Sequence, residues 1–257
     1  MQFTDTKYAP YSYSKQESYF SCPNKFKLTY IDKIKCISEN KAFEKGSYVH
    51  LFLENKISPT SENHEELLNY TFKLLTPQEQ KEIKDLCVRI FVSEYFQKLY
   101  RIVSVSDIIG VEQGFSFDKE WNPYSEYKRD QEILISGYID LMAIKGKTGF
   151  VLDYKTGKPK GQYQTYEQAE LYALFLLKQY NLEKVKTIYY YVEHDTVYSK
   201  EYTFLEIQAL QNKFTDLLKT IENTTYFKKK VTKLCAWCDF FKSGDCSLSD
   251  EEILRVM

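Results

Sequence analysis

The stretch from residue 132 to residue 155 constrains the fold most, because two β-strand patterns are joined there by a very short turn. Residues 132–144 and 150–154 are rich in Ile, Leu, Val, Phe and Tyr, which favour strands. Gly146 suits the first central position of a type II′ two-residue turn. The sequence therefore predicts a β-hairpin in which Lys145 faces Thr148.

The same register places two acidic side chains opposite each other. Counting outward from the turn pairs Asp140 with Asp153, and alternation along the strand puts Lys155 on the face of Asp153. Directly opposed residues have Cβ atoms about 4.5–5.5 Å apart, where like charges repel. We therefore expect a divalent cation between the two carboxylates, and Mg²⁺ prefers oxygen ligands of this kind.

The composition predicts a folded protein with a substantial core. The chain has 257 residues, 43% of them hydrophobic, and a formal net charge of −1, which gives no global attraction to nucleic acid but leaves room for a local basic groove. The first fifteen residues lack the apolar core of a signal peptide, and the apolar run 171–177 is too short to span a bilayer. We expect a cytoplasmic protein, in which structural disulfides are uncommon.

The order of elements predicts an α/β (α+β) fold, with a central mixed sheet flanked by helices. We expect a single domain, 1–257, with a helical part at 1–100, a core at 101–225 and a tail at 226–257. The predicted helices are 14–37, interrupted at Pro23, then 41–56, 64–75, 79–100, 164–180 and 205–223; the predicted strands are 101–106, 110–117, 132–145, 149–155, 187–193 and 197–204.

Several short motifs in this order resemble a known family. Gly137-x-x-Asp140 is followed after twelve residues by Asp153-Tyr154-Lys155-Thr156-Gly157, then by Gln168-x-x-x-Tyr172, and His50 lies upstream in Gly-Ser-Tyr-Val-His. Together they resemble the RecB-type branch of the PD-(D/E)XK nuclease superfamily, from about residue 14 to residue 246. The resemblance implies a restriction-endonuclease-like core and phosphodiester hydrolysis.

The resemblance also implies roles for these residues. His50, Asp140, Asp153 and the backbone carbonyl of Tyr154 would hold Mg²⁺ or Mn²⁺, the imidazole favouring manganese somewhat. Lys155 would orient water or stabilise developing negative charge, and a role as the base stays open.

Two more positions complete the expected site. Gln168 and Tyr172 lie four residues apart, on one helix face, and would position DNA or the region of Lys155. Glu112, in an adjacent strand pattern, is a weaker candidate for a metal ligand or a supporting group.

Four of the six cysteines form a second constellation. Cys235, Cys238 and Cys246 have C-x₂-C-x₇-C spacing, and Cys22 lies far upstream. This order resembles the iron–sulfur members of the same superfamily, the AddB-like nuclease subunits and the CRISPR-adaptation exonucleases, and implies a [4Fe–4S] cluster. Four thiolates also suit a structural Zn²⁺, so zinc stays open as the alternative. Cys36 and Cys87 are interpreted as buried thiols.

Basic and aromatic residues indicate where DNA would bind. Phosphates would contact Lys158 and Lys160, and the lysines at 228–230 and 233, while unpaired bases would stack on Phe20, Tyr163 and Tyr166. The sequence contains no GxxxxGK[ST] phosphate loop, so the chain would not unwind DNA itself. It would act alone, or with a helicase or recombination partner that supplies opened DNA.

These features predict a metal-dependent exodeoxyribonuclease. We expect it to act on DNA ends or single-stranded DNA during replication, recombination or repair. A DNA-binding or assembly subunit with a silent site, and an RNA-processing nuclease, are the alternatives.

Overall fold

The computed structural model of the protein describes residues 6–36, 41–57, 62–130 and 132–256. Its centre is a six-stranded sheet in the order β2-β1-β3-β4-β5-β6. All neighbouring strands are antiparallel except β4 and β5. The strands are β1 (Ile108–Asp118), β2 (Pro123–Tyr124), β3 (Ile133–Lys145), β4 (Thr148–Lys155), β5 (Lys184–Tyr191) and β6 (Thr196–Thr203).

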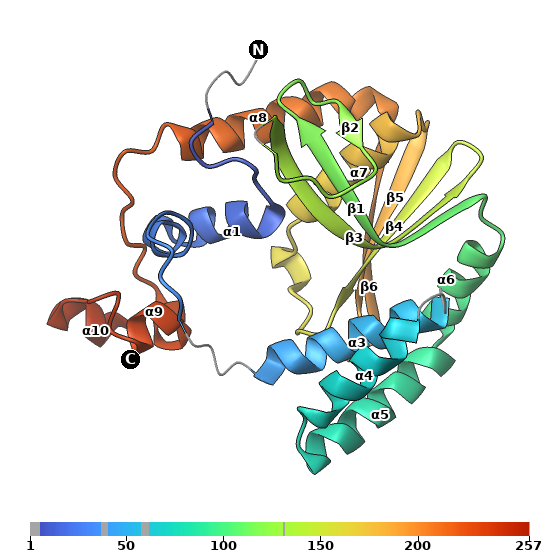
Figure 1. Cartoon of the computed structure of the whole chain (residues 1–257), viewed down its shortest axis with the longest axis horizontal. Coiled ribbons are helices and arrows are strands. Elements are labelled where there is room, and N and C mark those ends of the chain that lie inside the picture. The colour runs from blue at the N-terminus through green and yellow to red at the C-terminus, as the bar shows by residue number, and fades with distance from the viewer. Residues whose placement is uncertain (1–5, 37–40, 58–61, 131, 257) are drawn as a thin grey trace.

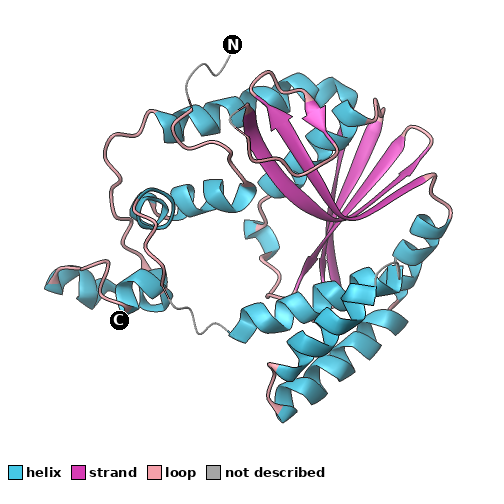
Figure 2. Cartoon of the chain, viewed as in Figure 1, coloured by secondary structure: helices cyan, strands magenta, loops and turns pink. Residues whose placement is uncertain are grey.

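Helices cover both faces of this sheet (Figures 1 and 2). Alternate strand residues enter two separate cores: Met142 and Val151 face one, while Leu141 and Leu152 face the other. The helices of the first core are α1 (Tyr13–Ser21), α7 (Glu167–Gln179) and α8 (Ile207–Glu222). The helices of the second core are α3 (Lys41–Ile57), α5 (Pro77–Val92) and α6 (Glu94–Ser104). Helix α4 (Glu62–Lys73) packs beside α3. The predicted fold, a mixed sheet flanked by helices, is confirmed.

The one parallel pair explains the layout around the hairpin. Antiparallel strands are joined by tight turns, but parallel neighbours need a crossover, and α7 provides it between β4 and β5. This helix is hydrophobic over most of its surface, with Ala169 to Leu177 buried. Because α7 begins shortly after Lys155, its first turn lies next to the end of β4.

The N-terminal helix α1 and the C-terminal segment lie on the same side of the molecule, away from the sheet (Figure 1). The N-terminal helices continue beyond α1 as α2 (Pro23–Phe26) and the π-helical turn Lys27–Ile31, and the C-terminal segment contains the 3₁₀ turn Lys233–Trp237, α9 (Asp239–Lys242) and α10 (Asp250–Val256). Tyr11 Oη donates a buried hydrogen bond of 2.6 Å to Glu222 Oε1 at the end of α8.

Three predicted elements differ from the structure. Residues 79–100 are not one helix, because Ser93 ends α5 and caps α6, accepting a bond from the Phe96 N–H. The strand predicted at 101–106 is wrong: Arg101 to Ser104 form the last turn of α6, whose apolar residues pack against the sheet. The helix predicted to reach residue 37 ends at Ile31, and residues 37–40 lie outside the described part.

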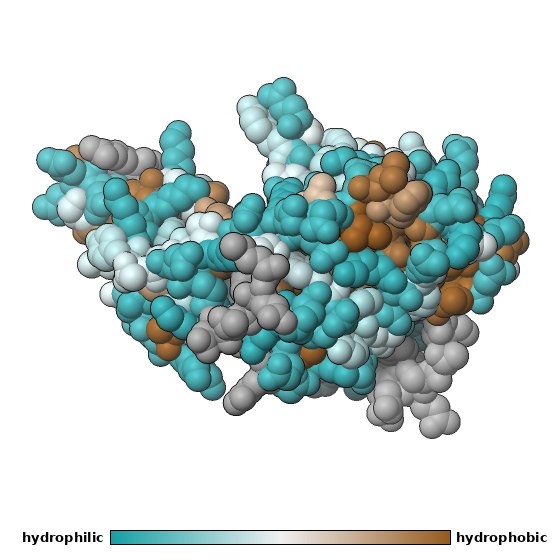
Figure 3. Space-filling view, turned by 90° about the horizontal axis from the view of Figure 1, so that it is seen from above, coloured by the Kyte–Doolittle hydropathy of each residue, from teal (hydrophilic) through white to brown (hydrophobic). Residues whose placement is uncertain are grey.

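Seen from above, the surface is mostly hydrophilic, with hydrophobic side chains gathered on the right of the view (Figure 3). No helix in the described ranges is long and apolar enough to cross a bilayer.

Candidate functional site

The β3–β4 hairpin has the predicted register. Lys145 pairs with Thr148 across a two-residue turn, and Gly146 has a φ of +56°, a backbone conformation that glycine adopts at low cost. The last pair of the ladder is Leu141 with Leu152, one step before Asp140 and Asp153. The two carboxylates therefore lie at the open end of the hairpin.

Asp140 is held by the neighbouring strand and by helix α3. Its Oδ2 accepts a hydrogen bond of 2.8 Å from the Tyr154 N–H. His50, on α3, places Nδ1 3.4 Å from the same Oδ2 and Nε2 3.2 Å from the Tyr154 carbonyl oxygen. Burial lowers the pKa of His50, which favours the neutral imidazole that a metal ion requires.

Glu112 brings a third carboxyl group to this point. Strand β1 pairs with β3 on both sides of it, through Val111–Leu141 and Gln113–Ile139, so Glu112 lies opposite Asp140. Its φ of +45° is left-handed, which is uncommon for a residue other than glycine, and such strain is concentrated at functional sites.

Donor atoms of His50, Glu112 and Asp140 all lie within 4.8 Å of one another, the geometry of a candidate metal site among the residues that the structure describes. A nitrogen and two carboxylate oxygens suit Mg²⁺ or Mn²⁺.

A fourth carboxyl group supports Glu112 from α3. Glu54, one turn after His50, is only 5% exposed, and its side chain hydrogen bonds to the carboxyl of Glu112. Glu112 as a whole residue is exposed, but its carboxyl group is partly shielded from water. This desolvation raises the pKa of Glu112, and the negative charge of Glu54 raises the same pKa further. Burial also raises the pKa of Glu54. Crowded acidic groups of this kind are stabilised by a bound cation.

The two predicted aspartates are also strongly perturbed. Burial raises the pKa of Asp140 to about 7, and burial together with the charge of Asp140 raises the pKa of Asp153 to about 7. Asp153 Oδ2 is buried and accepts no well-aligned hydrogen bond, although Lys155 Nζ lies 2.5 Å away in an ion pair. The contact with the Lys155 ammonium partly offsets the burial of this carboxyl group.

Lys155 links the acidic group to helix α7. Its Nζ donates a hydrogen bond of 2.8 Å to Gln168 Oε1, and Gln168 Nε2 donates one of 2.8 Å to Tyr172 Oη. Tyr172 is 5% exposed and packs edge-on against Phe115, so its hydroxyl is firmly placed. The structure therefore brings the predicted Lys155, Gln168 and Tyr172 into one chain of contacts.

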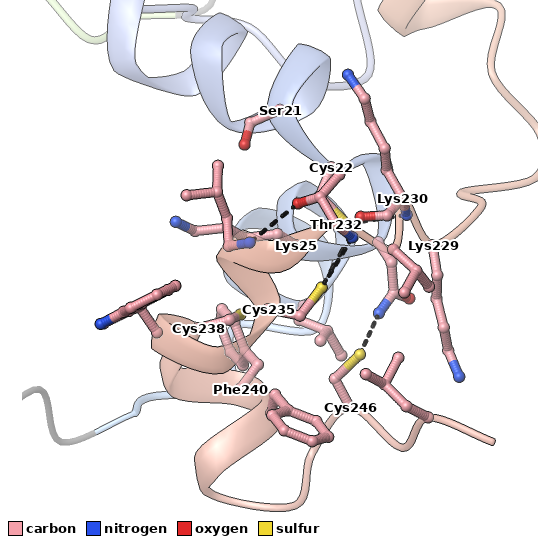
Figure 4. A pocket seen from close by; sticks show the side chains of 17 residues that line it. Ser21, Cys22, Lys25, Lys229, Lys230, Thr232, Cys235, Cys238, Phe240 and Cys246 are labelled. Atoms are coloured by element: carbon pink, nitrogen blue, oxygen red, sulfur yellow. Dashed lines mark hydrogen bonds between the residues drawn. The ribbon is translucent and has the colours of Figure 1, made fainter. Parts of the chain in front are cut away.

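The four predicted cysteines line one cavity of about 170 Å³ (Figure 4). Cys22 lies between α1 and α2, Cys235 in the 3₁₀ turn, Cys238 at the start of α9 and Cys246 after it. Three sulfur atoms accept N–H hydrogen bonds: the Lys230 N–H is 3.5 Å from Cys22, the Thr232 N–H 3.5 Å from Cys235, and Asn24 Nδ2 3.4 Å from Cys246. Segments more than two hundred residues apart thus meet around four thiols.

The other two cysteines differ from each other. Cys87 is 4% exposed and packs with Ile83, Leu86 and Ile90, as predicted. The prediction of a buried Cys36 is wrong: it is half-buried, with its sulfur 3.6 Å from Ser243 Oγ, because the chain has already left the helix at this point.

The predicted DNA-contacting residues are spread over two regions. Lys158 and Lys160 line a polar cavity beside Lys155, whereas Lys229 and Lys230 line the cysteine cavity. Tyr163 is 75% exposed, while Tyr166 stacks on Tyr189 with ring centres 5.8 Å apart. The remaining predicted contacts, Phe20, Lys228 and Lys233, lie at the N- and C-terminal segments.

Comparison with known proteins agrees with the fold and the motifs. The family described as the PD-(D/E)XK nuclease superfamily matches residues 10–242, and the chain belongs to it.

Two curated relatives are similar to part of the chain, and each is the A-type subunit of an ATP-dependent helicase/nuclease from Listeria monocytogenes. The protein of serotype 4b is 29% identical over 153 residues, and that of serovar 1/2a is 26% identical over 157. Each match covers 56% of this chain and 12% of the relative, so the chain spans a small part of their length. A solved structure called "Crystal structure of SSO0001" matches 82% of this chain and 99% of its own, with 13% identity and a TM-score of 0.34, too slight a likeness to support an argument.

Proposed function

We propose that this nuclease is a metal-dependent exodeoxyribonuclease whose Mg²⁺ or Mn²⁺ is held by His50, Glu112, Asp140, Asp153 and the Tyr154 carbonyl. The observation that carries the proposal is the convergence of two carboxylates from adjacent strands, Glu112 of β1 and Asp140 of β3, on the imidazole of His50. A bound divalent ion supplies Lewis-acid stabilisation of the phosphate and lowers the pKa of water.

The other site residues act on the substrate and on water. Lys155 places a positive charge beside Asp153, where it orients the attacking water and stabilises negative charge that develops on the phosphate. Gln168 restrains the Lys155 ammonium, and Tyr172 in turn restrains Gln168. These two residues keep the ammonium in a single position rather than contacting the scissile bond, which reduces the reorganisation needed during the reaction.

The proposed substrate is DNA with a free end or a single-stranded region, in replication, recombination or repair. Two observations support it. The basic groups beside Lys155 are lysines suited to phosphates, which carry no sequence information, so cutting is expected to be sequence-tolerant. The relatives are named as helicase/nuclease subunits, which supports a helicase partner that supplies opened DNA.

We further propose that Cys22, Cys235, Cys238 and Cys246 hold a [4Fe–4S] cluster. Four thiolates could also hold a single Zn²⁺, which is the alternative. The 170 Å³ cavity and the N–H bonds to three sulfurs favour a larger cluster of thiolate-bound iron.

The cluster would fasten the N-terminal helices to the C-terminal segment and contribute folding free energy. The test is the visible absorption spectrum and the metal content of anaerobically purified protein. A brown preparation with about four iron atoms per chain is expected. A colourless preparation with one zinc per chain would refute the iron–sulfur cluster and support the zinc site.

Digestion of end-labelled DNA tests the nuclease. We expect Mg²⁺- or Mn²⁺-dependent release of products from the end of single-stranded DNA, and its loss in Asp153→Ala. Asp216→Ala, which removes an exposed carboxylate of α8, is the matched control. Binding without cutting would indicate a silent protein, and preferential cutting of a matched RNA would indicate an RNA-processing enzyme; either result contradicts the proposal.

A further inference from the structure

A second cavity, of about 300 Å³, adjoins the acidic site and has the opposite charge. Lys155 and Gln168 form the wall that the two share. On the far side of that wall the cavity is lined by Lys158 and Lys160, from the loop that follows β4, and by Tyr189 and Tyr191 of β5.

Helix α1 forms the opposing wall. Tyr13, Ser14 and Glu17, from its first turns, line the cavity. The start of this helix is fixed, because the Tyr11 N–H donates to the Leu134 carbonyl at 2.8 Å and the Ser12 side chain caps the helix. The N-terminal helix is thus tied to strand β3, which also carries Asp140.

The two lysines are available for a ligand. Both are exposed, and neither forms an ion pair with any residue that the structure describes. Among the described residues that line this cavity, Glu17 is the one carboxylate, so the charge of the cavity is predominantly positive. A polyanion cannot lie stably against four carboxyl groups alone, whereas this basic cavity beside them attracts phosphate.

The walls also limit the shape of the ligand. Tyr191 Oη donates to Gln164 Oε1 at 2.6 Å, and Tyr189 Oη accepts from the Ala169 N–H at 3.0 Å, so these rings are held in place. A volume near 300 Å³ is at the lower end of the range for small-molecule pockets, enough for one nucleotide but not for its paired partner.

We propose that this basic cavity, which we call the α1 cavity, binds the unpaired nucleotide next to the scissile phosphate, with Lys158 and Lys160 on its phosphates and α1 as the opposite wall. The inference rests on the proposed nuclease function and names single-stranded DNA as the ligand of the cavity. It assigns a substrate-binding role to the N-terminal helix, which carries none of the nuclease motifs.

Fluorescence anisotropy with a labelled oligothymidylate tests this in a buffer with EDTA, where no cleavage can occur. The double variant Lys158→Ala/Lys160→Ala is expected to bind roughly tenfold more weakly at low salt. The slope of log affinity against log salt is expected to fall by about 1.4, since each lost contact to a single strand contributes about 0.7. Glu17→Gln is expected to bind about two- to threefold more tightly, because one repulsive charge is removed.

The matched control is Lys145→Ala/Lys186→Ala, which removes two exposed lysines at the other end of the sheet and is expected to bind as the native protein does. Competition with an unlabelled duplex of the same sequence is expected to be weaker than with the single strand. Equal loss of affinity in both double variants, or no loss in either, would overturn the proposal, as would tighter binding of the duplex.

Binding and cleavage separate the two hypotheses. If DNA is cut with Mg²⁺ or Mn²⁺ but the lysine variants bind normally, the α1 cavity is refuted and the nuclease stands. If binding depends on these lysines but no metal supports cutting, the nuclease is refuted while the role of the cavity in binding single strands stands.

Discussion

Removing the carboxylate of Asp153 should change how the stability of the metal-free protein depends on pH. Its pKa is about 7 in the folded protein, chiefly because of burial, against an ordinary value of 3.8. The folded protein therefore binds more protons than the unfolded chain between about pH 4 and pH 7. The contribution of this group to stability is fully present below pH 4 and is lost as the pH rises through 7.

The magnitude follows from the shift. Three pH units at about 1.4 kcal/mol each give at most about 4 kcal/mol for Asp153, a large part of the typical stability of a domain. Relaxation of the site and entry of water reduce this, so we expect a difference of about 1–4 kcal/mol. Asp153→Asn, which keeps the shape but cannot ionise, should be more stable than the native protein at pH 8 and lose that advantage at pH 4.

Urea denaturation in EDTA at pH 4, 6 and 8 measures this, with Asp216→Asn as the control for an exposed aspartate. Adding Mn²⁺ at pH 8 should stabilise the native protein much more than Asp153→Asn. Identical pH dependence of the two proteins without metal would refute the argument that burial of this carboxyl is costly.

Three further predictions concern other groups. Glu54→Ala should weaken Mn²⁺ binding about 10- to 100-fold by removing the partner of Glu112. Glu54→Gln, which keeps a hydrogen-bonding side chain of the same length, should restore most of the affinity in calorimetry. Equal affinities for both variants would contradict this. Lys155→Ala should lower the rate of cleavage about 10²- to 10³-fold without weakening Mn²⁺ binding, and a variant that loses metal affinity instead would count against its proposed role. Cys238→Ser should lower the iron content of the protein. Cys36→Ser should not, because Cys36 does not line the cysteine cavity. Equal loss of iron in both variants would place Cys36 among the ligands.

Local patterns were enough to predict the arrangement of the hairpin and of one helix face. The hairpin turn at Gly146 fixes the register of β3 and β4, so the end of the hairpin that carries Asp140 and Asp153 could be predicted from the chain. The four-residue spacing of Gln168 and Tyr172 likewise predicts one helix face, and the structure joins them by a hydrogen bond.

Contacts that depend on tertiary packing were not predictable in the same way. Glu112 lies opposite Asp140 only because β1 pairs with β3 across a long connection, whose register no short turn determines. Glu54 lies one turn after His50 on α3, and that spacing was a usable signal, but its contact with Glu112 depends on how α3 packs on the sheet. The wall formed by Tyr13 also depends on packing, since it requires the bridge between Tyr11 and β3.

Intrinsic strand propensity gave a wrong prediction where tertiary contacts outweighed it. The β-branched residues Ile102 and Val103 favoured a strand, yet they complete a helix that Ser93 starts and that buries Phe96 and Val103 against the second core. The same Ser93 divides the predicted helix 79–100, because its side chain caps a helix more effectively than it continues one.

Calorimetric titration of Mn²⁺ into chelator-treated protein tests the central claim, that the acidic group at the end of the hairpin binds a divalent ion. Saturable binding is predicted for the native protein, weakened at least tenfold in Asp140→Asn and unchanged in Asp216→Asn. No binding to the native protein, or equal binding to all three proteins, would contradict the account.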